Sequence, residues 1–215
     1  MVELHPRAVW VAGICGLAFL VLSLLVGLGL AGVGHVDVTE ARALTDETAG
    51  HPGYVSALRF LTNALSPTTF RVLGLVVAVA LLVIGERRLA VWVVVAMVVG
   101  GALGIGIKDA IARHRPTPEH PIGHFGGFSY PSGHALNAAL GCGVLLIVVL
   151  PMLSHAWRRV AWVVAVVLVT LTGWTRLALG AHYLSDVVGG WLLGVCVIAT
   201  TLVLLRVTPL RWPRA

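Results

Sequence analysis

Apolar residues occupy this chain in long runs that are separated by short polar segments. A helix that crosses a bilayer needs ~20 mostly apolar residues, and six runs meet or approach this length. They lie at about residues 9–32, 69–85, 89–107, 134–151, 159–176 and 187–206. The pattern predicts an all-α protein, in which six transmembrane helices form one bundle and one domain over residues 1–215.

The connection between the first two spans, residues 33–68, is the longest and predicts a short interfacial helical segment. Asp37 and Thr39 are residue types that accept free backbone N–H groups at a helix start, so a capped start is predicted at about residues 37–40. Apolar residues then recur at helical spacing: Tyr54, Leu58, Leu61 and Leu65. Such spacing favours a helix that lies in the membrane interface.

The composition supports a membrane protein, because 58% of the residues are hydrophobic, only 11% are charged, and the mean hydropathy is +0.95. A soluble domain has about a quarter of charged residues. The cores of the predicted spans carry no acidic or basic residue, which argues against a pump or an ion-coupled transporter. The first run is too long for a signal-peptide core and is followed by no convincing cleavage site, so it is expected to remain as a helix.

Charge and cysteine content argue against a nucleic-acid-binding protein and against a disulfide or metal site. The net charge is +6, but basic residues stand singly or in pairs between apolar runs, and no continuous basic stripe indicates nucleic acid. The three cysteines all fall inside apolar runs, so neither a disulfide nor a metal site is expected. No cofactor is indicated.

Lysine and arginine predict the orientation. Arg7, Arg87-Arg88, Arg158-Arg159 and a tail with Arg206, Arg211 and Arg214 fall on one side of the predicted bundle. The positive-inside rule makes this side cytoplasmic. Both termini are therefore expected inside, and the remaining polar clusters outside.

Three polar runs on the predicted outer side carry the candidate chemistry. In the first, Lys108 is followed seven residues later by Arg115 and then Pro116. If the helix continues, seven residues return to nearly the same face, and Pro116 then disfavours further helix. Taken alone, such a basic pair often just extends to lipid headgroups.

The second run is Pro131-Ser132-Gly133-His134, immediately before the fourth span. Ser132 is a suitable N-cap, and Gly133 allows close approach of an anion to the positive end of the helix. His134 in the first turn is placed to donate a proton. An ordinary helix cap with an interfacial histidine is the simpler interpretation of this run by itself.

The third run contains Arg176, His182 and Asp186. His182 and Asp186 are four residues apart, so their side chains meet if they lie on a helix. A carboxylate bonded to one imidazole nitrogen fixes the tautomer and leaves the other nitrogen as a base or nucleophile. A local ion pair without function is the alternative here. All three runs together, each at the end of a span on one side, indicate a site for phosphate chemistry.

The three runs, with their order and spacing, resemble the three-part signature of the phosphatidic acid phosphatase type 2 superfamily, whose members are integral-membrane lipid phosphate phosphatases. The resemblance covers residues 108–186 closely. Thr175 stands where that family commonly has serine, which keeps a hydroxyl.

The resemblance implies a role for each residue of the signature. His182 would be the nucleophile that forms a phosphohistidine, and Asp186 would support its imidazole. His134 would protonate the leaving oxygen and then activate water. The phosphate would be held by the remaining members: Lys108, Arg115, Ser132, Gly133 and Arg176.

Other polar residues near the signature are interpreted as structural. Arg113 and His114 are expected to be solvated at the interface. His120 and His124 lack a third partner for a metal, and the loop 116–130 is expected to form a flexible rim of the site.

The resemblance implies metal-independent hydrolysis of a lipid phosphate or diphosphate at the extracytoplasmic face of a plasma membrane, in a chain whose small size suggests a bacterial origin. Candidate substrates are polyprenyl diphosphate, phosphatidylglycerol phosphate and phosphatidic acid, with a slight preference for polyprenyl recycling in cell-wall synthesis. One alternative is a phosphotransferase of the same superfamily that uses a lipid or sugar acceptor. Another is a non-catalytic lipid-binding or transport protein. The partners expected are the lipid substrate and membrane lipids, and the oligomeric state stays open.

Overall fold

The computed structural model describes residues 4–119 and 121–207, and this part of the chain is helical throughout, without a strand. The elements are α1 (Leu4–Gly27), α2 (Ala31–Ala49), α3 (Pro52–Ala64), α4 (Pro67–Val83), α5 (Arg87–Ile111), α6 (Gly133–Val149), the 3-10 turn η1 (Leu150–Met152), α7 (His155–Ala178) and α8 (Leu184–Leu204). The prediction of an all-α bundle is confirmed.

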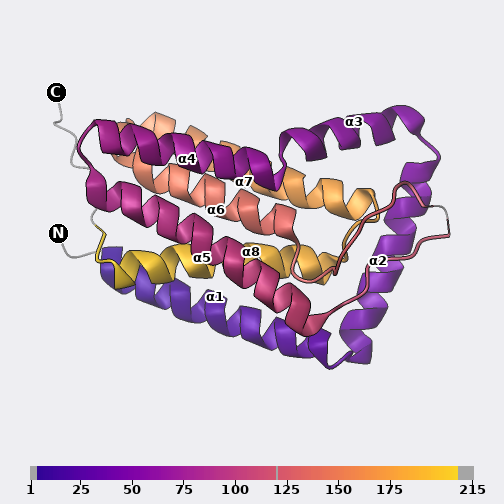
Figure 1. Cartoon of the computed structure of the whole chain (residues 1–215). Helices are drawn as coiled ribbons and strands as arrows, with labels where there is room; N and C mark the ends of the chain where they lie inside the picture. Colours follow the sequence, from indigo (N-terminus) through magenta and orange to yellow (C-terminus); the bar gives the residue numbers. More distant parts are fainter. Residues whose placement is uncertain (1–3, 120, 208–215) are drawn as a thin grey trace.

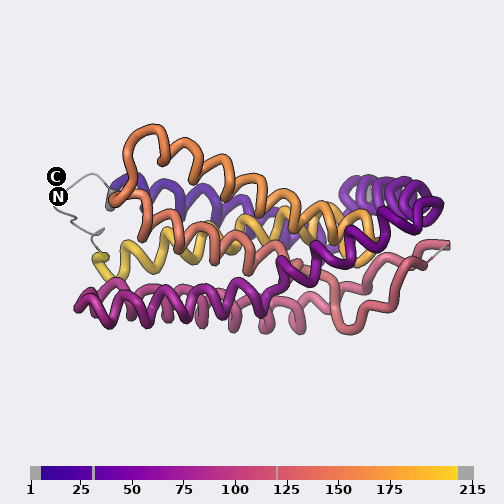
Figure 2. The backbone as a smooth tube through the Cα atoms, turned by 90° about the horizontal axis from the view of Figure 1, so that it is seen from above, coloured from indigo at the N-terminus to yellow at the C-terminus, as the bar shows by residue number. Residues whose placement is uncertain are grey.

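Six helical segments among the described residues are long and apolar enough to cross a membrane. They are Pro6–Gly27, Pro52–Val83, Arg87–Ile111, Gly133–Met152, His155–Ala178 and Leu184–Leu204. Figure 1 shows α1, α4, α5, α6, α7 and α8 running along the bundle, with α2 crossing one end of it, and the view from above in Figure 2 agrees. The start of α1 and the end of α8 lie together at the opposite end.

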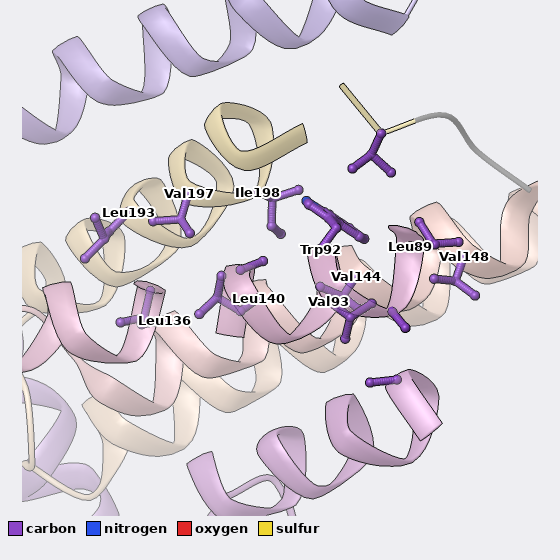
Figure 3. Packing of buried hydrophobic residues seen from close by; sticks show 14 of the residues in the cluster. Leu89, Trp92, Val93, Leu136, Leu140, Val144, Val148, Leu193, Val197 and Ile198 are labelled. Atoms are coloured by element: carbon purple, nitrogen blue, oxygen red, sulfur yellow. The ribbon is translucent and has the colours of Figure 1, made fainter. Parts of the chain in front are cut away.

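The central helix of the bundle is α6, which packs against α4, α5, α7 and α8. Figure 3 shows Leu136, Leu140 and Val144 of α6, at four-residue spacing, between side chains of α5 and α8. Trp92 of α5 is fully buried among them, and its Nε1–H donates to Thr201 Oγ1 of α8 at 3.0 Å. In lipid such close packing and interhelical hydrogen bonds hold helices together, since the tails are as apolar as the side chains.

Glycines bring the start of α8 against the start of α6. A Cβ on Gly190 would lie 2.7 Å from Ser132 O, and one on Gly194 would lie 2.8 Å from Ala139 Cβ. Helices approach so closely only where the side chain is a hydrogen atom. The two glycines thus set the distance between the second and third polar runs.

The connection between α1 and α4 differs from the prediction. The first helix ends at Gly27 rather than near residue 32, because the chain turns at Gly29, whose φ of +62° is the left-handed conformation that glycine tolerates. The start predicted at residues 37–40 is wrong, since Asp37 and Thr39 lie inside α2. The interfacial segment contains two helices, and the spacing from Tyr54 onward correctly predicted α3.

Candidate active site

The three polar runs meet at the end of the bundle that α2 crosses. The backbone N–H of Ser132, before α6, donates to the carbonyl of Asp186 in α8 at 2.9 Å. Arg115, in the loop after α5, lies 3.1 Å from His182 through its Nη1. The structure therefore brings together residues from all three runs.

His182 lies in the turn between α7 and α8, with both ring nitrogens in defined surroundings. Nδ1 is 3.4 Å from Asp186 Oδ2, and Nε2 is 3.1 Å from Nη1 of Arg115. Because a guanidinium can only donate hydrogen bonds, Nε2 is the acceptor in this pair. The neutral imidazole then carries its proton on Nδ1, facing the carboxylate, and has its lone pair on Nε2.

The loop carrying Arg115 is not a continuation of α5. The helix ends at Ile111, and Ala112 takes a left-handed conformation with φ +49°, so the expectation that Lys108 and Arg115 share a helix face is wrong. Arg115 is instead held by carbonyls, with Nε donating to Gly126 and Gly127 at 3.0 Å and Nη1 donating to Ala181 at 2.6 Å. These bonds fix the guanidinium beside His182.

The start of α6 has free polar groups. Ser132 occupies the N-cap position, as predicted, but its side chain caps nothing. Its Oγ is buried and has no partner among the described residues. A Cβ on Gly133 would meet no atom within 4 Å, so the space beside this turn is open. An anion seated there would receive helix N–H groups and the Ser132 hydroxyl.

Arg176 approaches from the end of α7 and is 5% exposed. Its Nη1 donates to Thr62 Oγ1 of α3 at 2.9 Å, and its guanidinium lies 5.0 Å from the ring centroid of Phe125. Its buried Nε has no partner within the described part of the chain. The hydroxyl of the preceding Thr175 donates to a backbone carbonyl of its own helix at 2.8 Å.

Two of the sequence-predicted phosphate-binding positions thus present unpaired buried donors, Ser132 Oγ and Arg176 Nε. A buried polar atom without a partner costs about 1–3 kcal/mol. Phosphate oxygens would satisfy both donors, and the residues present therefore fit an anion.

Lys108 has another arrangement. Its Nζ donates to the carbonyls of Phe128, Ser129 and Pro131 at 2.9, 3.2 and 2.9 Å. An ammonium group has three protons, so all of them hold the loop that leads into α6. Lys108 therefore contributes positive charge to the site and fixes the loop, but it has no N–H left to donate to a phosphate.

His134 lies in the first turn of α6 and is half-buried. Arg176, His182 and Arg115 lie near enough to act on it electrostatically. His134 therefore belongs to the same polar cluster.

Asp186 is fully buried in the first turn of α8. Its Oδ2 accepts from the hydroxyl of Ser129 and from the N–H of Tyr183, the latter at 2.8 Å. Its Oδ1 accepts from Nη1 of Arg113 at 2.8 Å. Both oxygens of this carboxylate are therefore held by donors from outside α8.

Arg113 contradicts the prediction of a solvated side chain. Its Nη2 donates to Asp37 Oδ2 at 2.7 Å, and its guanidinium stacks 4.2 Å from the ring centroid of Tyr183. Burial lowers the pKa of Arg113, but the carboxylates of Asp186 and Asp37 outweigh it and raise the pKa above its usual value. No local sequence signal pointed to this role, because Asp37 and Asp186 lie 76 and 73 residues from Arg113.

Burial lowers the pKa of His182 to about 4, against the hydrogen bond and the charge of Asp186, which act to raise it. The positive charges of Arg115 and Arg176 lower it further. The imidazole is therefore neutral over the physiological range. This is the form that can act as a nucleophile.

The loop 116–130 packs on α3 and α7 rather than standing free. Arg59 of α3 donates to Ile122 O at 2.6 Å, and Ile122 and Phe125 contact Leu58 and Leu179. No group of three metal-ligating residues occurs among the residues described. His120, one of the two loop histidines considered for a metal, lies outside the described residues.

Residues 89–208 match the family model described as the PAP2 superfamily, which is more than half of the chain. Three curated relatives also match. Phosphatidylglycerophosphatase B of Bacillus subtilis is 39% identical over 92 residues, 41% of this chain and 44% of the relative. Undecaprenyl-diphosphatase of Sulfolobus acidocaldarius is 31% identical over 124 residues, 55% and 56% of the two chains.

Lipid A 1-phosphatase of Rhizobium etli is 35% identical over 130 residues, 55% of this chain and 54% of the relative. The chain spans about half the length of the curated relatives it matches. Among solved structures, a transmembrane PAP2 type phosphatidylglycerolphosphate phosphatase from Bacillus subtilis has a TM-score of 0.77 at 23% identity, over 88% of this chain and 93% of that one. This likeness shows that the fold is shared over most of the chain.

Proposed function

The chain belongs to the PAP2 superfamily, and we propose that this integral membrane protein hydrolyses a lipid phosphate or diphosphate through a phosphohistidine at His182, without a metal ion. The single observation that carries the proposal is the placement of His182. Its Nδ1 faces Asp186, while its Nε2 faces the guanidinium of Arg115, where a phosphoryl group would sit.

The reaction has two steps. In the first, the Nε2 lone pair attacks phosphorus, the bond from phosphorus to the leaving oxygen breaks, and His134 gives its proton to that oxygen. In the second, His134 takes a proton from water, the water oxygen attacks phosphorus, and the bond to Nε2 breaks to release phosphate. Asp186 stabilises the positive charge that the imidazole carries between the steps.

Phosphoryl transfer spreads charge over the non-bridging oxygens, so catalysis depends mainly on positioning and electrostatics. Arg115 and Arg176 supply fixed guanidinium groups, which bind phosphate in a planar, two-pronged manner. Ser132 Oγ and the free N–H groups at Gly133 complete the seat. Lys108 adds positive charge from behind the loop.

The substrate class is a lipid with a compact phosphate headgroup. Polyprenyl diphosphate, phosphatidylglycerol phosphate and phosphatidic acid all present such a group, and the relatives' names include an undecaprenyl-diphosphatase and a phosphatidylglycerophosphatase. The site lies at the end of the bundle away from the paired arginines that begin α5 and α7. We place it at the extracytoplasmic face, with both termini inside, in keeping with the positive-inside rule.

The test is phosphate release from these three lipids in detergent with EDTA, by the wild type and by His182→Ala. We expect metal-independent release that falls by several orders of magnitude in the variant, because catalytic residues that act as a unit lose their effect together. Acid-labile, base-stable label on the protein after a quench with labelled substrate would identify the phosphohistidine.

Equal rates in both proteins, or strict dependence on Mg²⁺, would refute the proposed chemistry. A phosphorylated acceptor in place of free phosphate would assign the chain to the transferases. As a control, Arg59→Gln alters a cation of α3 that donates to the carbonyl of Ile122 in the loop.

A further inference from the structure

Asp37 of α2 is buried, with 2% of its surface exposed, and lies in a polar cluster that reaches the candidate catalytic carboxylate. Its Oδ1 accepts from the backbone N–H of Ser185 at 3.0 Å, and its Oδ2 accepts from Ser185 Oγ and from Arg113 Nη2 at 2.5 and 2.7 Å. Arg113 Nη1 bonds in turn to Asp186 Oδ1 at 2.8 Å. One guanidinium therefore bridges two buried carboxylates from helices α2 and α8.

We propose that Asp37 and Arg113 are positioning residues for the phosphohistidine reaction: Arg113 orients Asp186, and Asp37 balances the charge of Arg113 so that Asp186 still stabilises a positively charged His182. The inference rests on the proposed function.

The orientation of the Asp186 carboxylate follows from the different partners of its two oxygens. Arg113 holds Oδ1, which leaves Oδ2 directed at His182 Nδ1 and at the donors Ser129 and Tyr183. Without Arg113 nothing opposes a swing of Oδ1, and only the donors on Oδ2 hold the carboxylate. Partners that fix a histidine–carboxylate pair in metal sites are worth about 10–100-fold in activity.

The charge argument explains why the cluster contains a second carboxylate. Arg113 alone would largely cancel Asp186, because oppositely charged groups in contact away from water interact strongly. With Asp37 included, the cluster carries two negative charges and one positive charge. The remaining negative charge is matched when the imidazole becomes positive on attacking phosphorus.

The cluster also makes α2 part of the catalytic apparatus. The buried face of this helix is small and polar, with Asp37, Ala41, Thr45 and Thr48. Thr45 packs on Gly180, in the turn that leads to His182. A helix that lies across the end of the bundle in Figure 1 thereby bears directly on the orientation of the nucleophile.

The charged and titratable groups that face His182 come from four elements: Asp186 of α8, Arg115 of the loop, Arg176 of α7 and His134 of α6. Arg113 and Asp37 act on it through Asp186. Removing the positive charge of Arg113 must raise the pKa of His182, and removing the negative charge of Asp37 must lower it. A mere loss of folded protein would leave the pKa of His182 in place.

The experiment compares kcat, KM and the acid limb of kcat/KM for the wild type, Arg113→Gln, Arg113→Lys and Asp37→Asn in the full-length protein. We expect kcat to fall about 10–100-fold in Arg113→Gln and Asp37→Asn, with KM little changed. The acid limb, expected near pH 4 in the wild type from the pKa of His182, should move up in Arg113→Gln and down in Asp37→Asn. Arg113→Lys keeps the charge and should keep the limb near its wild-type position.

Glu40→Gln is the matched control, since it removes the same charge from the exposed face of α2 and should change neither kcat nor the limb. Only folded protein contributes to the measured activity, so partial misfolding does not change the pH at which the acid limb lies. Unchanged kcat in both variants, or limbs that stay in place or move together, would overturn the inference. If His182→Ala itself remains active, the proposed function fails instead, whatever the Arg113 variants do.

Discussion

At the level of single residues, Ser132 presents a buried hydroxyl that has no hydrogen-bond partner within residues 4–119 and 121–207. The free protein carries the cost of this unpaired group, about 1–3 kcal/mol, whereas a bound phosphate would satisfy it. We therefore expect Ser132→Ala to keep or raise the Tm while it lowers kcat/KM for the lipid phosphate roughly 10–100-fold, because a hydrogen bond to a charged group contributes about 1.5–3 kcal/mol. Thermal unfolding and phosphate release on the same preparation test both effects.

Ser23→Ala is the contrasting variant. Its hydroxyl donates to Phe19 O at 2.7 Å and lies 2.9 Å from the Tyr130 hydroxyl, so its removal leaves a buried phenol without a partner. The Tm should fall by several degrees and kcat/KM should hold. A Tm loss in Ser132→Ala as large as in Ser23→Ala would contradict the assignment of Ser132 to the anion seat.

The residues of the site could be predicted from the sequence where a short spacing links them. His182 and Asp186 are four residues apart and do meet. Arg113 could not be predicted, because its partners Asp37 and Asp186 lie 76 and 73 residues away, and nothing local distinguishes it from a solvated arginine. The role of Lys108 in holding the loop depends likewise on carbonyls whose direction only the fold sets.

At the level of elements, the turn between α7 and α8 depends on Gly180. Its φ of +66° is a left-handed conformation that costs other residues roughly 1–2 kcal/mol. A Cβ there would also lie 2.8 Å from Thr45 Cγ2. We expect Gly180→Ala to destabilise the protein by more than about 1 kcal/mol in chemical unfolding, and to reduce kcat because the turn carries His182.

Two further variants separate the effect of the backbone conformation at Gly180 from the effect of the contact with Thr45. Thr45→Ser removes the methyl group that a new Cβ would meet, so Gly180→Ala combined with Thr45→Ser should recover part of the loss. Gly101→Ala, in α5, places a Cβ where no atom lies within 4 Å, and should stabilise by up to about 1 kcal/mol. Equal stability of Gly180→Ala and the wild type would show that α2 does not press on this turn.

The helices themselves were predictable because a bilayer leaves backbone groups no partner except those within the helix, which demands long apolar runs. The ends of the helices were harder to predict. The apolar run continues through Leu28 and Leu30 across the turn at Gly29, so hydropathy alone extended the first span by about one turn of helix. The start of α2 was misplaced because Asp37, a residue type typical of caps, is held inside the helix by Arg113.

At the level of the whole molecule, the distribution of arginine sets an orientation that can be measured. Arg7, Arg87 and Arg158 lie at the end of the bundle opposite α2. The cations at the other end include Arg113 and Arg115, which are engaged with carboxylates and the loop in the site. The positive-inside rule therefore predicts that the end opposite α2 lies on the cytoplasmic side.

Accessible cysteines would report this directly, because the native Cys15, Cys142 and Cys196 lie within helices of the bundle. We expect Glu47→Cys on the exposed face of α2 to react with a membrane-impermeant maleimide in right-side-out vesicles. Arg87→Cys at the start of α5 should react only in inverted or permeabilised vesicles. The reverse pattern would place the site in the cytoplasm, and the substrate would then have to be a lipid phosphate of the inner leaflet. Labelling of both positions in sealed vesicles of one orientation would mean that the chain inserts both ways, as a weak charge bias permits.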